Sequence, residues 1–434
     1  MATENRLKRF YGATAVYLIS NTLNAAIPFA LLPILTRYLN PTEYGQVAIF
    51  QSLVAGVIAF TGLSIDGAAN RKFFDKNAYD YELKEFITSG LYLSGLVAGL
   101  VLLIAYGVRN TLQDWLGIPP IWIYSTALVS FSMMFIKIRL GQWQVQKRPL
   151  PFGALQIFYS LLNFGTSMIL VILLLRGASG RIEGYIISTV IISVFAITSL
   201  SRNGLLGFFS CTREKIREIL EFGVPLIPHA IGVYVLTSLD RIIVGQHIGL
   251  DQAGIYMVAA QLGMGVRIIF DAINKGYVPW LFETLKKNDR KELERTVQNT
   301  YIAFFLISFL AGAAFFFMPP ILILVAGDDY AAAGEIVGWV VAAQCCTGMY
   351  LLVTNYLFYS RRNHILSGIT ILAGIVHVIL LIFLIEEFGA LGAGVAMFLS
   401  SLIRFLATWR AAAIVHPMPW NEGFKKWGAK GKDK

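Results

Sequence analysis

The chain has 434 residues, of which 56% are hydrophobic and only 14% are charged, and its formal net charge is +10. A soluble domain carries about a quarter of charged residues, so the composition excludes an ordinary soluble protein and indicates a polytopic membrane protein. No Walker A loop, GxSxG motif or metal-ligand spacing occurs in the sequence, so no ATP-driven step, catalytic residue, metal site or cofactor is expected.

Apolar stretches recur along the chain and predict an all-α fold of twelve transmembrane helices, since a spanning helix needs about 20 such residues. The first stretch follows the basic sequence MATENRLKRF and is too long and too polar for a cleavable signal peptide. We therefore expect it to remain as the first span. The predicted spans are 12–37, 44–66, 86–108, 120–139, 153–175, 183–201, 222–244, 253–275, 297–318, 334–359, 365–385 and 390–413.

Basic residues gather in alternate connections between these spans. The segments 71–84, 202–217 and 286–295 are rich in Lys and Arg, whereas the other set of connections holds only isolated arginines. Cytoplasmic loops of membrane proteins carry this excess. The pattern predicts twelve spans with both termini in the cytoplasm, and it accounts for the net charge without a nucleic-acid partner.

The two halves of the chain resemble each other at an offset of 209 residues. YLNPTEYGQVAIFQSLVAGV (38–57) aligns with HIGLDQAGIYMVAAQLGMGV (247–266), and Gly45 meets Gly254. Six spans in each half predict a parallel repeat of two six-helix bundles, an arrangement typical of transporters. The segment between them is amphipathic, and it is either an interfacial helix or a solvated linker. The expected parts are bundle 1–205, linker 206–221, bundle 222–416 and basic cytoplasmic tail 417–434.

Three stretches resemble a known family in their order and spacing. IPFALLPILTRYLNPTEYGQVAIFQSL (27–53) carries a P-T-E-Y-G turn, LDRIIVGQHIGLDQAGIYMVAAQLG (239–263) carries D-R-x-x-(I/V)-G followed by A-G-x-Y, and GDDYAAAGEIVGWVV (327–341) carries G-x-x-Y-x-x-A. Together they resemble Wzx-type oligosaccharide flippases of the polysaccharide-biosynthesis branch of the MOP exporter superfamily, which includes MATE transporters. The resemblance implies two bundles around a hydrophilic cavity and a polyprenyl-diphosphate-linked oligosaccharide as substrate.

Charged residues interrupt the eighth predicted span at four-residue intervals. Arg267, Asp271 and Lys275 share one helical face, and ionisable residues inside a membrane are functional candidates. We predict that Arg267 binds the diphosphate and that Asp271 holds it or exchanges a coupling proton. The alternative is that the basic side chains extend to the lipid headgroups. This alternative is favoured for Lys275, because Lys275 lies at the boundary of the span. The counterparts in the first half are Ile58 and Gly62, so the stripe belongs to one half only.

Further polar residues lie within other predicted spans, where each has either a binding role or a packing role. Asp240 and Arg241 lie deep in the seventh span, where helix pairing is the alternative to facing the cavity. Pro225 and Pro228 precede His229, which is either a titrating group or a packed one. Further candidates for the cavity wall are Asn21 and Asn24, then Gln51, Asn163, Gln261, Gln344, Asn355 and Arg404.

The leading hypothesis is a bacterial inner-membrane flippase that moves undecaprenyl-diphosphate-linked repeat units for O-antigen, capsule or exopolysaccharide from the inner to the outer leaflet. It would operate by alternating access, with H⁺ or Na⁺ as coupling ion and with a polysaccharide polymerase and chain-length regulator as partners. A MATE-like exporter of small molecules is one alternative. A membrane polymerase or glycosyltransferase of the same pathway is another, although the short outer connections disfavour it.

Overall fold

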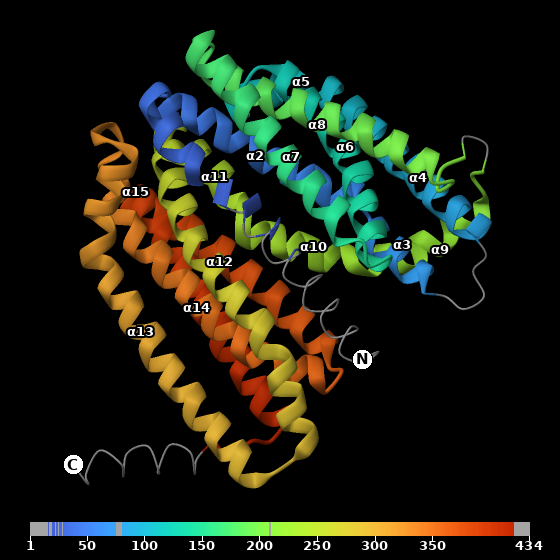
Figure 1. Cartoon of the computed structure of the whole chain (residues 1–434). Helices are drawn as coiled ribbons and strands as arrows, with labels where there is room; N and C mark the ends of the chain where they lie inside the picture. The colour runs from blue at the N-terminus through green and yellow to red at the C-terminus, as the bar shows by residue number, and fades with distance from the viewer. Residues whose placement is uncertain are drawn as a thin grey trace. The chain divides into compact units, whose positions relative to one another are not determined.

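Helices form all the regular structure in the described part of the chain (Figure 1). The computed structural model describes residues 29–74, 80–207 and 210–420, together with residues 16, 20, 21, 23, 24, 26 and 27. The chain divides into two compact units, residues 1–254 and 255–434. The prediction of an all-α polytopic protein is therefore confirmed.

Ten helices of the described residues are long and apolar enough to cross a membrane. One of them, α15 (Asn363–Val415), contains two predicted spans, because its backbone leaves helical geometry at Gly389, with φ 58° and ψ −139°. Part of the first predicted span lies outside the described residues, and its end forms the helix Phe29–Tyr38. The observed helices are consistent with twelve spans.

The first unit is organised around α2, which packs against α4, α6, α8, α10 and α11. Contact thus groups the seventh predicted span with the first unit. The predicted limits 1–205 and 222–416 follow the sequence repeat and stay predictions. The helices of this unit are α2 (Pro41–Thr61), α3 (Ile65–Phe73), α4 (Asp80–Gly107), α5 (Arg109–Leu116), α6 (Pro120–Val145), α7 (Pro149–Met168), α8 (Gly177–Arg202), α9 (Arg213–Gly223), α10 (Ile227–Tyr234) and α11 (Asp240–Ile248).

The sequence NPTEYG fixes the start of α2. Asn40 is the N-cap, and its side-chain oxygen accepts a hydrogen bond from the backbone N–H of Glu43 at 2.9 Å. The Glu43 carboxylate accepts one from the backbone N–H of Asn40 at 3.1 Å, which completes a capping box. Pro41 occupies the first helical turn, where its missing N–H costs nothing. The P-T-E-Y-G turn is therefore a helix start.

Two glycines related by the repeat permit a close contact within the first unit. A Cβ on Gly45 would lie 1.8 Å from the carbonyl oxygen of Leu250, and a Cβ on Gly254 would lie 2.0 Å from the carbonyl oxygen of Pro41. Pro41 and Leu250 also correspond at the 209-residue offset. Residues that correspond in the two halves of the sequence therefore contact each other reciprocally, as they would across a twofold axis.

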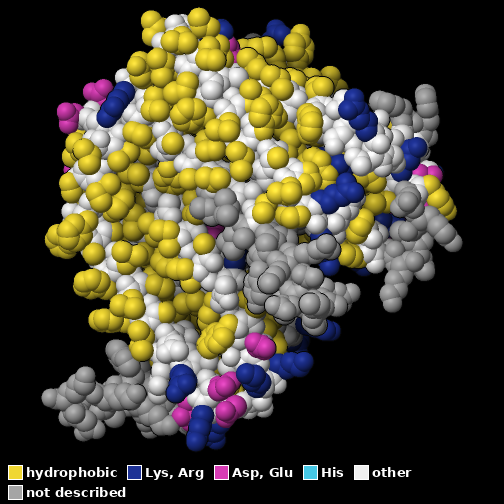
Figure 2. Space-filling model, viewed as in Figure 1, with side chains coloured by type: hydrophobic (Ala, Val, Ile, Leu, Met, Phe, Trp, Pro, Cys, Tyr) yellow, Lys and Arg dark blue, Asp and Glu magenta, His cyan; other side chains and the backbone are white. Residues whose placement is uncertain are grey.

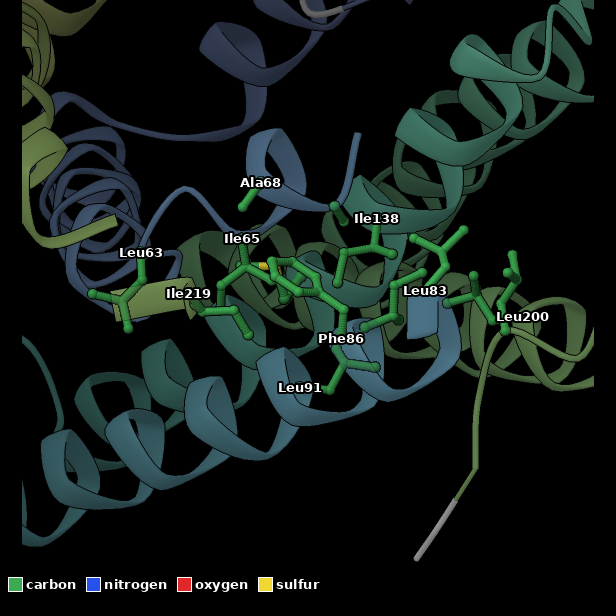
Figure 3. Close-up of a cluster of buried hydrophobic side chains, with 13 residues drawn as sticks. Leu63, Ile65, Ala68, Leu83, Phe86, Leu91, Ile138, Leu200 and Ile219 are labelled. Carbon is green, nitrogen blue, oxygen red and sulfur yellow. The ribbon is translucent and has the colours of Figure 1, made fainter. Parts of the chain in front are cut away.

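Helix α9 packs its apolar face against the first unit. Its Ile219 is fully buried among Ile65, Phe86 and other side chains of α3, α4, α6 and α8 (Figure 3). The ammonium of Lys72 lies 3.0 Å from the Glu218 carboxylate, and that of Lys215 lies 3.7 Å from it. The apolar face of α9 therefore packs against protein, and whether its exposed face meets the headgroups or water stays a prediction. Residues 208–209 of the predicted linker and 421–434 of the predicted tail lie outside the described residues.

The second unit is a bundle of long helices, in which α14 packs against α13 and α15. Exposed apolar side chains cover α13, among them Phe305, Phe309 and Phe316. Figure 2 shows hydrophobic side chains along this flank and charged side chains at the end where α12 joins α13, as a lipid-facing surface requires. Beside α15, this unit contains α12 (Leu250–Lys287) from Ile255 onward, α13 (Arg290–Ala326) and α14 (Ala333–Tyr359).

Candidate functional site

The charged stripe predicted on the eighth span lies on α12 of the second unit. The Arg267 guanidinium is 3.8 Å from the Asp271 carboxylate, and the side chains are 42% and 45% exposed. Lys275 follows one turn later and is exposed. The structure therefore brings Arg267 and Asp271 into one loose, half-exposed ion pair.

Glycines bring α12 and α14 close together beside this pair. A Cβ on Gly263 of α12 would lie 2.4 Å from Val340, and one on Gly348 of α14 would lie 2.6 Å from the Phe270 ring. Phe270 lies between Arg267 and Asp271 in sequence. The ion pair is thus level with the part of α14 around Gly348.

Arg404 of α15 is a third ionisable residue near this part of α14. Arg404 donates a hydrogen bond from Nη2 to the Thr347 hydroxyl at 3.0 Å, and its guanidinium lies 4.5 Å above the Tyr350 ring. One turn further along α12, Asn274 accepts a hydrogen bond from the Asn355 amide at 2.8 Å. The second unit therefore holds a polar band of cations, amides and hydroxyls, chemically suited to phosphates and sugars.

Asp240 and Arg241 lie at the start of α11 in the first unit. Both are buried, and the Asp240 carboxylate accepts a hydrogen bond from the backbone N–H of Arg241 at 2.9 Å. A π-helix, Val235–Leu239, directly precedes them, and such segments occur at functional sites and kinks. Both side chains are enclosed by protein in this structure. Their predicted binding role stays a prediction.

His229 lies in the short helix α10, directly after Pro228. Its side chain is half-buried, and its Nδ1 has no hydrogen-bond partner among the described residues. A 3₁₀ turn, Val224–Leu226, precedes the helix. Its predicted binding role stays a prediction.

The predicted amides of the first span lie near α7. The hydroxyl of Ser160 donates a hydrogen bond to the Asn24 side chain, and Asn21 lies one turn earlier and is half-buried. Asn163 accepts a hydrogen bond from Arg181 at 2.7 Å. The side chains of Asn24 and Asn163 thus each form a hydrogen bond with another helix of the first unit.

Sequence reasoning missed a polar stripe on α7. Gln156, Ser160, Asn163 and Ser167 recur every three or four residues, and so they share one face. Arg181 of α8 is only 8% exposed, and it also donates to the Ser167 hydroxyl at 2.9 Å. The helical spacing of polar residues in an otherwise apolar span was the signal that could have revealed this stripe.

Among the described residues, no three His, Cys, Asp or Glu side chains gather in a way that could hold a metal ion. The polar groups described above are amides, hydroxyls, guanidiniums and the carboxylates of Asp240 and Asp271, which bind by hydrogen bonding and charge.

Comparison with solved structures shows the fold. Over 92% of this chain and 87% of the other, the TM-score is 0.75 with a structure titled lipid II flippase MurJ, inward closed conformation, at 12% identity. An inward-facing multidrug resistance MATE family transporter of the MOP superfamily gives a TM-score of 0.65 at 15% identity, over 92% of this chain and 94% of that one. The predicted MOP/MATE-like fold is confirmed.

Comparison with known sequences shows the family. Lsg locus putative protein 1 of Haemophilus influenzae is 24% identical over 372 residues, which cover 84% of this chain and 88% of that protein. The probable low-salt glycan biosynthesis flippase Agl15 of Haloferax volcanii is 19% identical over 390 residues, covering 88% and 79%. The family model described as polysaccharide biosynthesis protein matches residues 12–285, more than half of the sequence. The chain therefore belongs to the polysaccharide biosynthesis protein family.

Proposed function

We propose that the chain is a flippase, with no enzymatic step of its own, that moves undecaprenyl-diphosphate-linked oligosaccharides from the inner to the outer leaflet of a bacterial inner membrane. The observation that carries the proposal is the half-exposed Arg267–Asp271 pair, inside an apolar helix of a polysaccharide biosynthesis family member. A charge is costly within a membrane unless a partner or a function retains it. A diphosphate is the part of this substrate that needs a cation.

The rest of the substrate fits the other polar groups. Sugar hydroxyls require hydrogen-bond partners that hydrocarbon does not provide, and the amides of α12 and α14 in the second unit supply such partners. Alternating access between two bundles would expose these groups to each side in turn. The transported repeat would serve O-antigen, capsule or exopolysaccharide assembly, with a polymerase and a chain-length regulator acting on the product.

The direct test replaces Arg267 in cells that assemble a surface glycan. Arg267→Ala should abolish glycan export, and the lipid-linked repeat should accumulate on the inner leaflet, because the diphosphate loses its cation. Arg267→Lys should keep part of the activity, since an ammonium retains the charge without the bidentate geometry. Surface glycan and lipid-linked oligosaccharide are measured together with the amount of protein in the membrane.

Lys286→Ala is the matched control, because Lys286 is an exposed cation at the end of the same helix. Normal export by Arg267→Ala would remove Arg267 from the mechanism. Deleting the gene separates the functions: unchanged glycan with altered drug resistance would favour a MATE-like exporter. Lost chain extension with normal flipping would favour a polymerase.

Asp271 is the candidate for coupling transport to an ion gradient, with H⁺ or Na⁺ as the ion. A carboxylate that pairs loosely with a guanidinium at 3.8 Å can exchange a proton when a phosphate takes its place beside Arg267. Asp271→Asn should therefore uncouple transport from an imposed pH gradient in proteoliposomes. Full proton dependence in this variant would exclude the carboxylate as the coupling site, and a response to Na⁺ alone would identify the other ion.

A further inference from the structure

Arg404 is an enclosed arginine in an apolar helix, and the proposed role of Arg267 does not explain why it is there. Its Nη2 is fixed by the Thr347 hydroxyl, which itself donates to the carbonyl oxygen of Ala343 at 3.1 Å. The Tyr350 ring supports the guanidinium from one side at 4.5 Å. The Nε of Arg404 is buried and has no hydrogen-bond partner among the described residues. The guanidinium is therefore held in place while it keeps unused donor capacity.

Arg404 lies at the level of the Arg267–Asp271 pair. Thr347 is the neighbour of Gly348, and the Phe270 ring fills the space that a Cβ of Gly348 would need. Phe270 itself stands between Arg267 and Asp271 on α12.

The charges at this level do not balance. This level holds two guanidiniums and one carboxylate, and that carboxylate lies 3.8 Å from Arg267 at a half-exposed position. Among the described residues, no acidic group forms an ion pair with Arg404. A guanidinium enclosed by protein without a carboxylate partner is unfavourable, so a bound anion would stabilise Arg404.

We propose that Arg404 and Arg267 together bind the two phosphoryl groups of a diphosphate, and so select diphosphate-linked over monophosphate-linked lipids. This inference rests on the proposed function and adds a specificity-determining residue to it. A guanidinium binds a phosphate through two parallel N–H donors. Two guanidiniums on different helices can each take one phosphoryl group, whereas a monophosphate leaves one guanidinium without an anion.

The test compares the binding of undecaprenyl diphosphate and undecaprenyl phosphate to the purified full chain in detergent. The wild type should prefer the diphosphate by about ten- to hundredfold, the range expected from one additional charged hydrogen-bonded group. Arg404→Ala should reduce this ratio to near one and should weaken monophosphate binding little. Arg404→Lys should recover part of the preference, and Arg404→Gln provides a second uncharged variant if alanine impairs folding.

Arg410→Ala is the matched control, because Arg410 is an exposed arginine of the same helix, and it should keep the full preference. If the variants of Arg404 retain the wild-type ratio while Arg267→Ala loses diphosphate binding, the assignment of Arg404 is wrong and the flippase proposal stands. If the wild type binds neither lipid, the flippase proposal itself fails.

Discussion

Gly45 illustrates how one residue determines a helix contact in this protein. A Cβ at this position would overlap the carbonyl oxygen of Leu250 at 1.8 Å, and a backbone atom cannot move away as a side chain can. Gly45→Ala should therefore separate α2 from the start of α12 and destabilise the protein by about 1 to 3 kcal/mol, the usual cost of overpacking. The melting temperature in detergent, followed by tryptophan fluorescence, measures this loss.

Gly67→Ala is the matched control at the residue scale. A Cβ on Gly67 would meet nothing within 4 Å, and alanine favours a helix over glycine. An equal melting temperature for Gly45→Ala and wild type would show that the two helices separate without cost. The close contact at Gly45 would then contribute nothing to stability.

At the scale of elements, α9 depends on its apolar face. Ile219 is fully buried in the cluster shared with α3 and α4, and Ile219→Ala should cost about 2 to 5 kcal/mol because a cavity remains. The loss should appear as a lower melting temperature and as faster proteolysis between α8 and α10.

Arg217→Ala tests whether this effect comes from packing. Arg217 lies on the same helix, and its exposed guanidinium is 2.8 Å from Glu221. An exposed pair of this kind contributes about 0 to 1 kcal/mol, so the variant should melt close to wild type. If both variants melted alike, the packing of α9 against the bundle would contribute nothing to stability.

At the scale of the whole molecule, the distribution of basic residues predicts which connections face the cytoplasm. With Cys211, Cys345 and Cys346 changed to serine, Asp329→Cys should react with a membrane-impermeant maleimide in intact spheroplasts, because it lies in an outer connection. Lys287→Cys should react only in inverted vesicles. Both positions are exposed in the structure, so a difference in labelling reports the side of the membrane. Labelling of both from one side would contradict the predicted topology.

The sequence by itself determined the membrane class, the apolar spans and the charged stripe of α12. These features depend on composition and on the spacing of residues within one helix, and helical geometry is the same wherever the helix packs. The family motifs also followed from sequence alone, since the NPTEYG turn is a local capping structure around Asn40 and Glu43.

Only the tertiary structure decided which distant residues meet. Arg404 and Thr347 are separated by 57 residues, and the rotation of two helices about their axes decides whether such side chains face each other. Glycines that no periodicity distinguishes, such as Gly263 and Gly348, set how closely those helices approach. The same reason applies to Arg181 and Asn163, which form a hydrogen bond between α8 and α7, and to Ile219 of α9, which is buried against other helices of the first unit.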